Sequence, residues 1–429
     1  MDLSLVSLVA LVVVVLVSCA TNVNIGLLAM TLAWLIGSGV AAYLGEAIPA
    51  KTIAGYFPVE LFMTLVGTTL LFSIAQQNGA LRWITQAGVH ACRGNARLVP
   101  WLYFALAAGL SATGAGNVPT VALLASSAML TAQRLGISPL VMTIMIGHGS
   151  IGGTLSPLSP MGIIADKNIQ QMGLGDHSLY TFTINLAVNT IVVLCGYLLL
   201  RGWRVQKTTT HEDVTSIETM HHHDTETHLT RSHIATLSLI AMLIIGVVGF
   251  QIHLGLAAIG AATLLIVGGA ADERAAIRDL PWNVVLMVCG MTVLVTLCEK
   301  TGGLDRFGKL LAACATPETV TGWMAGVTGL ISVFSSTSGV VLPAFLPTVP
   351  VVLANLGGSG EPMPDKLLAV ATAVNIGSNL VDVSSVSTIG ALCVAATPDE
   401  AARRLLFRHA LIWGLSMSVV GAVLCGVML

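Results

Sequence analysis

The two halves of the chain carry the same pattern of glycine and small polar residues. One block returns in the second half at a constant offset, with Gly67, Thr69, Leu71, Gly79 and Leu81 followed by Gly290, Thr292, Leu294, Gly302 and Leu304. Further copies relate Gly26 and Gly39 to Gly255 and Gly268, Ser111-Ala112-Thr113 with Pro119 to Ser335-Ser336-Thr337 with Pro343, and Gly149-Ser150, Ser156, Ser159 and Gly162 to Gly377-Ser378, Ser384, Ser387 and Gly390. A duplicated unit whose small polar residues interrupt apolar segments at matching places is typical of secondary transporters.

Composition places the chain in a membrane. Of its 429 residues 55% are hydrophobic and only 9% are charged, whereas a soluble domain carries roughly 25% charged residues. Its eight cysteines are scattered, mostly inside apolar runs, and this favours small core residues over a disulfide framework or a zinc site. We therefore expect an all-α polytopic membrane protein. Its helices should contact membrane lipid, and we expect it to bind no nucleic acid.

A spanning helix needs about 20 mostly apolar residues. Ten stretches meet this need, namely 3–20, 25–44, 59–78, 140–164, 179–200, 234–252, 254–270, 283–299, 366–396 and 409–428. The stretches 140–164 and 366–396 are interrupted by polar residues. We interpret 3–20 as a retained first span, because no basic stretch precedes it and no clear cleavage site follows it.

Two further apolar stretches, 98–133 and 321–354, are broken in the middle by Ser, Thr and Gly and then by Pro. Each half is short for a full span, and we interpret both stretches as re-entrant hairpins. Non-helical backbone at membrane depth survives only where it is buried in protein or lines a wet cavity. The alternative is that each stretch is two ordinary spans joined by a tight turn.

Five crossings per repeat insert the second copy upside down, and the basic residues support this topology. One side receives Arg82, Arg93, Arg97, Arg134, Arg201, Arg204, Lys207, Arg231, Arg274, Arg278, Arg403, Arg404 and Arg408. The other side receives Lys51, Lys167, Lys300, Arg306, Lys309 and Lys366. Because basic residues favour the cytoplasmic side, we expect both termini to lie outside a bacterial inner membrane.

We divide the chain into a first repeat at 1–200, a linker at 201–233 and a second repeat at 234–429. The first repeat comprises a scaffold part at 1–58 and a transport part at 59–200. The linker contains His211, His221, His222, His223, His228 and His233. These imidazoles could bind a transition metal, but we favour a solvated cytoplasmic connection between the repeats.

The candidate binding groups inside the bilayer are nearly all neutral. Glycine lets backbone leave a helix and approach a ligand, freed carbonyls and hydroxyls can bind Na⁺, and half-helix N-termini favour anions. The expected substrate-binding residues are Ser111, Thr113, Asn117, His148, Ser156, Ser335, Ser336, Thr337 and Ser384. The expected cation ligands are Ser111, Gly149, Ser150, Gly153, Thr154, Ser335, Thr337, Ser378, Asn379 and Asp382. For a single Ser or Thr the simpler alternative is a bond to a helix carbonyl.

Asp382 and His148 are the ionisable residues expected near mid-membrane, where such groups are costly and usually functional. Asp382 completes a cation site or carries a proton. Its counterpart in the first repeat is Thr154, so the two sites are expected to be chemically unequal. His148 donates to a carboxylate, acts as a protonation switch, or is a satisfied packing residue.

These features resemble the ion transporter superfamily. The resemblance lies in Ser-Ile-Gly-Gly-Thr at 150–154, the Ser-x-Thr tips at 111–113 and 335–337, and the inverted repeat. The divalent anion/sodium symporters of that superfamily serve as the mechanistic model. Asn-Val-Asn-Ile-Gly-Leu-Leu-Ala at 22–29 and Val-Glu-Leu-Phe at 59–62 resemble, more narrowly, the bacterial MatC-type dicarboxylate (malonate) carriers.

The resemblance implies a homodimeric elevator, in which a transport part with both hairpins and both broken helices moves against a scaffold. It also implies that Ser111, Thr113, Ser335 and Thr337 touch carboxylates and cations. The chain departs from the superfamily pattern at the middle Asn of each tip, which is Ala112 and Ser336 here, and at the Pro-Pro-Asn that follows the broken helices.

We therefore expect symport of a small dicarboxylate such as malonate or succinate, with Na⁺ as the coupling ion, H⁺ as the alternative and no other cofactor. A Na⁺/H⁺ antiporter or an arsenite exporter on the same scaffold is the second hypothesis. An intramembrane enzyme is the third, and the sequence opposes it. An aspartyl protease needs two facing carboxylates, whereas only Asp382 is placed at depth, and the duplication argues against a serine protease.

Overall fold

The computed structural model describes residues 2–20, 23–81, 83, 97–200, 229–250, 252–335, 337–357 and 363–429. Within these ranges every regular element is a helix. The polar segment 201–228, which holds most of the predicted His-rich linker, lies outside the described residues, as does Ser336.

The helices of the first half follow the predicted apolar stretches. They are α1 (Leu3–Ala20), α2 (Ile25–Trp34), α3 (Ala41–Tyr43), α4 (Ala50–Ala54), α5 (Val59–Gln77), α7 (Val99–Leu110), α8 (Asn117–Arg134), α9 (Pro139–Gly153), α10 (Pro160–Gln171) and α11 (Ser178–Leu199). Two π-helical segments, η1 (Leu35–Val40) and η2 (Ser111–Ala115), continue α2 and α7.

The helices of the second half follow in chain order. They are α13 (Arg231–Phe250), α14 (Leu254–Val267), α15 (Glu273–Arg278), α16 (Trp282–Lys300), α17 (Gly303–Ala312), α18 (Val320–Phe334), η3 (Thr337–Val341), α19 (Leu342–Phe345), η4 (Leu346–Thr348), α20 (Val349–Gly357), α21 (Pro364–Leu380), η5 (Val381–Val383), α22 (Thr388–Ala396) and α23 (Glu400–Met428).

Seven helical stretches of the described residues are long and apolar enough to cross a membrane, fewer than the ten crossings expected. They are Ile25–Tyr43, Ala50–Gln77, Ser178–Leu199, Trp282–Lys300, Thr337–Gly357, Pro364–Ala396 and Glu400–Met428. Three of the other predicted spans form shorter apolar helices, at Leu3–Val17, Arg231–Gly246 and Leu254–Val267. The predicted span 140–164 is divided between α9 and α10 by a non-helical turn.

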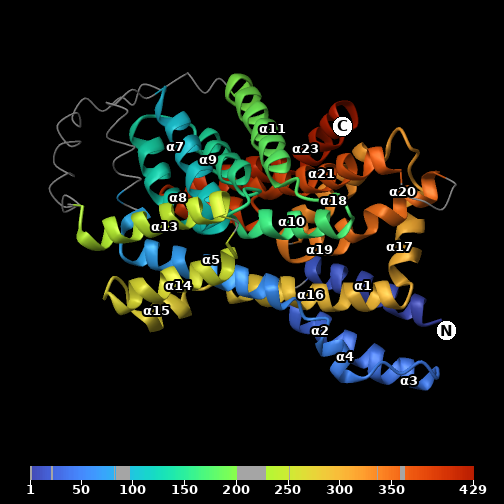
Figure 1. Cartoon of the computed structure of the whole chain (residues 1–429). Helices are drawn as coiled ribbons and strands as arrows, with labels where there is room; N and C mark the ends of the chain where they lie inside the picture. Colours follow the sequence, from blue (N-terminus) through green and yellow to red (C-terminus); the bar gives the residue numbers. More distant parts are fainter. Residues whose placement is uncertain are drawn as a thin grey trace.

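The helices form two groups that are visible in Figure 1. In the lower group α14 packs along α5, and α16 packs along α2. In the upper group α7, α8 and α11 pack on α9, while α18 and α23 pack on α21. We name these groups the lower layer and the upper layer. Each of the two close pairs in the lower layer joins a helix of one half of the chain to a helix of the other.

Glycine makes both lower-layer pairs possible. A Cβ atom on Gly290 would lie 2.1 Å from the Gly26 carbonyl oxygen, and one on Gly67 would lie 2.3 Å from the Gly255 carbonyl oxygen. In the sequence Gly26 is the counterpart of Gly255, and Gly67 is the counterpart of Gly290. The two contacts are therefore reciprocal. Gly26 of the first half meets Gly290 of the second half, and their counterparts Gly255 and Gly67 meet in the same way.

The glycines of the two broken helices do not unwind the backbone, contrary to expectation. Gly149 and Gly153 lie within α9, and Gly377 lies within α21. They permit close packing instead: a Cβ on Gly153 would lie 2.2 Å from the Ala108 carbonyl oxygen, and one on Gly377 would lie 2.3 Å from that of Ala325. The helix is interrupted only after these glycines, between α9 and α10 and between η5 and α22.

The predicted tip of the first hairpin is a true break. Gly114 and Gly116 have φ angles of 116° and 78°, which L side chains rarely adopt, so glycine is needed at both positions. In the second hairpin Ser335 is extended and ends α18. Segment η2 contacts α5 and segment η3 contacts α16, so both tips rest on long helices of the lower layer.

Candidate functional site

The tip of the second hairpin meets the second broken helix through Thr337. Its Oγ1 donates to Asp382 Oδ1 at 2.8 Å and lies 3.2 Å from the Ser378 carbonyl oxygen and 2.5 Å from Ser332 Oγ. Ser387 Oγ lies 3.4 Å from the same Asp382 oxygen. We name this cluster of Ser332, Thr337, Ser378, Asp382 and Ser387 the second cradle.

The second cradle holds more acceptors than donors. Only the hydroxyls of Ser332, Thr337 and Ser387 carry protons, while the Ser378 carbonyl and the Asp382 carboxylate only accept. Asp382 is 6% exposed and follows the C-terminus of α21, where the helix dipole favours positive charge. An oxygen cluster with a buried carboxylate at such a position suits a hard cation.

The matching position in the first repeat is neutral. We name Ser111, Gly153 and Thr154 the first cradle. Ser111 and Thr154 are fully buried; the Ser111 hydroxyl has no hydrogen-bond partner, and Thr154 Oγ1 lies 4.0 Å from the Met161 sulfur. Thr113, the counterpart of Thr337, donates to the Leu110 carbonyl of its own arm at 2.9 Å. The two cradles are chemically unequal.

Several predicted site hydroxyls bond within their own helix, which is the simpler alternative. Ser150 donates to the Gly147 carbonyl at 2.8 Å, and Ser378 Oγ donates to the Val374 carbonyl at 2.7 Å. Ser378 therefore contributes its backbone carbonyl to the second cradle, while its hydroxyl is engaged elsewhere.

Ser156 and Ser384 hold the turns that interrupt the broken helices. Ser156 Oγ accepts from the Leu158 N–H at 3.3 Å, and Ser384 Oγ accepts from the Val386 N–H at 3.4 Å. The two repeats use these serines in the same way. The contacts position the turns, and each hydroxyl keeps its proton for a further acceptor.

The remaining predicted residues have separate surroundings. Asn117 begins α8, is buried and uses its Oδ1 to accept from the Val118 N–H at 2.9 Å. Asn379 donates to the Asn375 carbonyl at 2.7 Å, while its own Oδ1 has no partner. Ser335 closes α18 in extended conformation.

His148 lies in a continuous chain of hydrogen bonds. Trp413 Nε1 donates to His148 Nε2 at 2.9 Å, and His148 Nδ1 lies 2.9 Å from Asn189 Oδ1. Because indole N–H only donates, Nε2 must accept and the ring proton sits on Nδ1. Both ring nitrogens are thus used by protein groups, as expected of a packing residue.

The chain of bonds continues to the end of the first broken helix. Asn189 Nδ2 donates to the Asn185 carbonyl at 2.9 Å and lies 3.2 Å from Asn185 Oδ1. Asn185 Nδ2 donates to the Ile151 carbonyl at 2.7 Å and the Gly152 carbonyl at 3.2 Å. Asn185, Asn189 and Trp413 were not among the predicted site residues, although two asparagines four residues apart in an apolar helix were a detectable signal.

Another polar group lies along α21, where Thr372 and Asn375, which were not predicted, accompany the predicted residue Asn379. Thr372 Oγ1, both side-chain polar atoms of Asn375 and Asn379 Oδ1 are buried and have no hydrogen-bond partner. The spacing of three and four residues places these side chains along one helix face. Buried polar atoms without protein partners point to water, an ion or a ligand.

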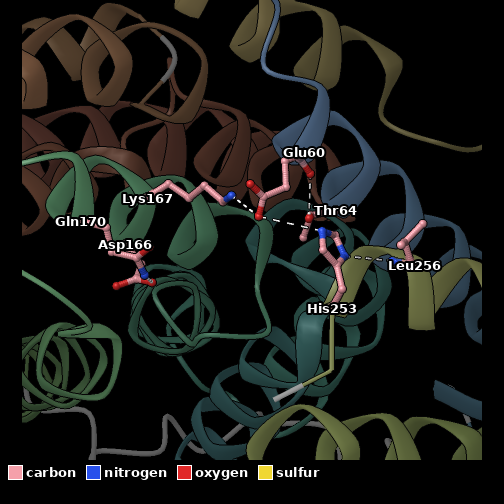
Figure 2. Close-up of polar contacts among 7 residues, drawn as sticks. All are labelled: Glu60, Thr64, Asp166, Lys167, Gln170, His253 and Leu256. Atoms are coloured by element: carbon pink, nitrogen blue, oxygen red, sulfur yellow. Dashed lines mark hydrogen bonds and ion pairs between the residues drawn. The ribbon is translucent and has the colours of Figure 1, made fainter. Parts of the chain in front are cut away.

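An ion pair joins α10, which packs on α11 of the upper layer, to α5 of the lower layer (Figure 2). Lys167 on α10 pairs with Glu60 at the start of α5, and His253 Nε2 lies 3.8 Å from the same Glu60 oxygen. His253 Nδ1 accepts from the Leu256 N–H at 3.3 Å and so caps α14. The neutral ring therefore carries its proton on Nε2, which faces Glu60.

Apolar spanning helices, interrupted where buried polar groups gather, define a polytopic membrane transporter. Residues 1–154 match the family model described as "Dicarboxylate carrier protein MatC N-terminus", and this confirms the expected resemblance over that part of the chain. The family and the relatives described next are transporters, not enzymes, as expected.

Two proteins of Mycobacterium tuberculosis, one from strain CDC 1551 and one from strain H37Rv, are both named uncharacterized transporters. Each is 24% identical to this chain over 349 residues. The matched region covers 78% of this chain and 78% of each relative. The YdaH transporter of Alcanivorax borkumensis, whose crystal structure is described as having an unusual topology, shares the fold with a TM-score of 0.58. That match has 16% identity and covers 94% of this chain and 97% of the other.

Proposed function

We propose that the protein is a secondary transporter that carries a small dicarboxylate, such as malonate or succinate, together with a cation across the bacterial inner membrane. The family match over residues 1–154 supports the class of substrate. The observation that carries the coupling is the second cradle, where the Asp382 carboxylate meets the Thr337 hydroxyl at 2.8 Å. We assign Na⁺ as the coupling ion, because neutral oxygens surround a single carboxylate there.

The substrate carboxylates are proposed to bind between the two cradles. Ser111 offers a buried hydroxyl without a partner, and α8, α10 and α22 each begin within the polar region. None of these three helices has a side-chain cap at its N-cap residue, and the dipole at such a half-helix N-terminus favours anionic groups. Ser111 and Asn117 are the proposed donors from the first hairpin, while a bound cation neutralises part of the substrate charge.

Reciprocal contacts support an inverted repeat. Gly26 with Gly290 and Gly67 with Gly255 are two copies of one contact. In a second reciprocal set, the second half of each broken helix packs on the opposite hairpin. Helix α22 packs on α8, and α10 packs on α19 and η4. Such exchange is expected of two units related by a two-fold axis in the membrane plane.

The layers suggest how the protein moves. The lower layer is proposed to be the scaffold and dimer interface, and the upper layer the part that moves with its cargo in an elevator mechanism. We place α5 in the scaffold, because it packs along α14, and therefore draw the boundary after α5 instead of at residue 58. The proposed orientation keeps the 201–233 linker in the cytoplasm and both termini outside.

Uptake into proteoliposomes tests the proposal. Labelled malonate and succinate are supplied with a Na⁺ gradient, a pH gradient or neither. Accumulation driven by the Na⁺ gradient is expected, and Asp382→Asn should abolish that dependence. The exposed Asp305→Asn serves as the control with the same chemical change. Failure of the wild-type protein to accumulate either acid under any gradient would remove the proposed function.

A further inference from the structure

The first broken helix ends against an amide that its copy does not have. Asn185 Nδ2 donates to the Ile151 and Gly152 carbonyls at 2.7 and 3.2 Å, and Asn185 is fully buried. At the offset that relates Gly149 to Gly377, Asn185 corresponds to Trp413. Trp413 has a single N–H group, which it donates to His148.

The orientation of the Asn185 amide follows from its neighbours. The two backbone carbonyls can only accept, so the NH₂ group must face them and Oδ1 must face Asn189. At the other end of the chain of bonds, the Trp413 N–H can only donate. The two ends agree on one direction for every bond between them, so the network fixes the amide in place.

The carbonyls that Asn185 holds belong to the last turn of α9, the first half of the broken helix. Their counterparts in the second half of the chain are the carbonyls of Asn379 and Leu380, which directly follow the Ser378 carbonyl of the second cradle. Carbonyl oxygens at a half-helix C-terminus are the groups that ligate coupling cations in transporters with broken helices. In the second repeat this position carries Asp382, and Thr337 reaches it across the hairpin tip. In the first repeat it carries Thr154, and the equivalent hydroxyl of Thr113 stays on its own arm.

We infer that Asn185 closes the first cradle to cations, so that the transporter binds one coupling cation per chain, in the second repeat. The Asn185 NH₂ group supplies to the Ile151 and Gly152 carbonyls the positive partner that a bound ion would otherwise provide. The first cradle remains neutral and available to the substrate. The inference rests on the proposed function and deepens it, because it sets the number and place of the coupling ions.

Equilibrium binding of ²²Na⁺ to the purified full-length chain tests the inference, with choline holding the ionic strength constant. The experiment is run with and without malonate, and binding of ¹⁴C-malonate is measured on the same samples. We expect one Na⁺ per wild-type chain and none in Asp382→Asn. Two Na⁺ per wild-type chain, with one surviving in Asp382→Asn, would overturn the inference and leave cation-coupled transport standing.

Asn185→Asp tests the amide itself. The variant replaces the amide that donates to the two carbonyls with a carboxylate, which can only accept. It should therefore bind a second Na⁺. Its unfolding temperature should also rise more with Na⁺ than that of the wild-type protein. The control is Asn355→Asp, which changes the same group at an exposed position of α20. There the amide donates to the Val351 carbonyl, and this variant should still bind one Na⁺.

The remaining outcomes are distinct. A count of one in well-folded Asn185→Asp would overturn the role of the amide. If that variant does not fold, the wild-type and Asp382→Asn counts still decide between one site and two. Malonate binding without any Na⁺ would overturn the inference but spare the dicarboxylate carrier. If the wild-type protein binds no malonate at all, the result would instead reject the proposed function.

Discussion

Thr113 and Thr337 occupy matching positions at the two hairpin tips, yet their hydroxyls have different partners. Thr113 bonds to a carbonyl of its own arm, whereas Thr337 reaches a carboxylate on another helix. A hydroxyl has one proton, so a threonine that donates within its helix has none left for a distant acceptor. The function of each threonine therefore depends on whether a stronger acceptor is within reach.

Thr337→Val should weaken Na⁺ dependence. The change removes a hydrogen bond to a charged group, which contributes about 1.5–3 kcal/mol, so the Na⁺ concentration for half-maximal uptake should rise about 10- to 150-fold. Uptake in proteoliposomes over a Na⁺ series measures the shift. Thr263→Val is the control, because Thr263 is exposed and bonds to the Ile259 carbonyl of its own helix. An unchanged Na⁺ dependence of Thr337→Val would remove this threonine from the cation site.

Trp413→Phe should lower stability, because His148 Nε2 loses the N–H donor that satisfies it. Leaving a buried acceptor unpaired costs about 1–3 kcal/mol. Thermal unfolding in detergent measures the loss, and Trp323→Phe on α18, where the side chain is 38% exposed, is the control. Equal unfolding temperatures for both variants would count against the network described for His148.

At the scale of elements, the glycine-rich stretches act through packing. Gly153 of α9 meets backbone atoms of α7 and η2, and Gly377 of α21 meets backbone atoms of α18. Backbone cannot yield as a flexible side chain can, so a Cβ at these positions has nowhere to go. Helix–helix association in membranes relies on such small residues, because no hydrophobic effect drives apolar helices together in lipid.

Gly153→Ala should destabilise the protein by about 1–3 kcal/mol, the usual cost of overpacking, because its Cβ would lie 2.2 Å from the Ala108 carbonyl oxygen. Gly109→Ala on the facing helix α7 is the control, since a Cβ there meets nothing within 4 Å. That control should be neutral or gain up to about 1 kcal/mol of helix propensity. Unfolding temperatures of the two variants, measured side by side, check the contrast, and equal losses would contradict it.

At the scale of the whole molecule, two layers meet through the hairpin tips and the ion pair of Lys167 with Glu60. The Lys167 side chain is 29% exposed and the Glu60 side chain 63% exposed, and ion pairs at exposed sites contribute only about 0–1 kcal/mol. Such a contact is too weak to hold the layers in one arrangement. It is strong enough to bias an equilibrium between two arrangements that differ little in free energy.

Reversing one charge of this pair should therefore change the transport rate up to about fivefold, and the double exchange Glu60→Lys with Lys167→Glu should restore it. The control exchanges Glu400 and Arg404, which form a pair along the single helix α23 and should leave transport unchanged. Uptake rates of single and double variants measure the coupling. Single variants that match the wild-type rate would show that the pair does not bias the motion.

Much of this fold was predictable because its causes are local. Apolar length predicted the helices, and the matched glycines indicated a repeated pattern. That these glycines are positions of close helix contact was not predicted and is seen only in the structure. The break at Gly114 and Gly116 was also evident from composition, since these positions require φ angles open mainly to glycine. The helical conformation of Gly149, Gly153 and Gly377 was not predictable, because glycine serves both unwinding and tight packing.

The sequence by itself determined that this is a helical membrane protein whose two halves carry small polar residues at matching places, because hydropathy and residue pattern are properties of the chain alone. Only the tertiary structure decided which of those residues face one another. Thr337 meets Asp382 and Asn185 meets the end of α9 through packing between segments far apart in the chain. A hydroxyl or amide on a helix always has a nearby backbone alternative, so its partner is chosen by what the fold brings within reach.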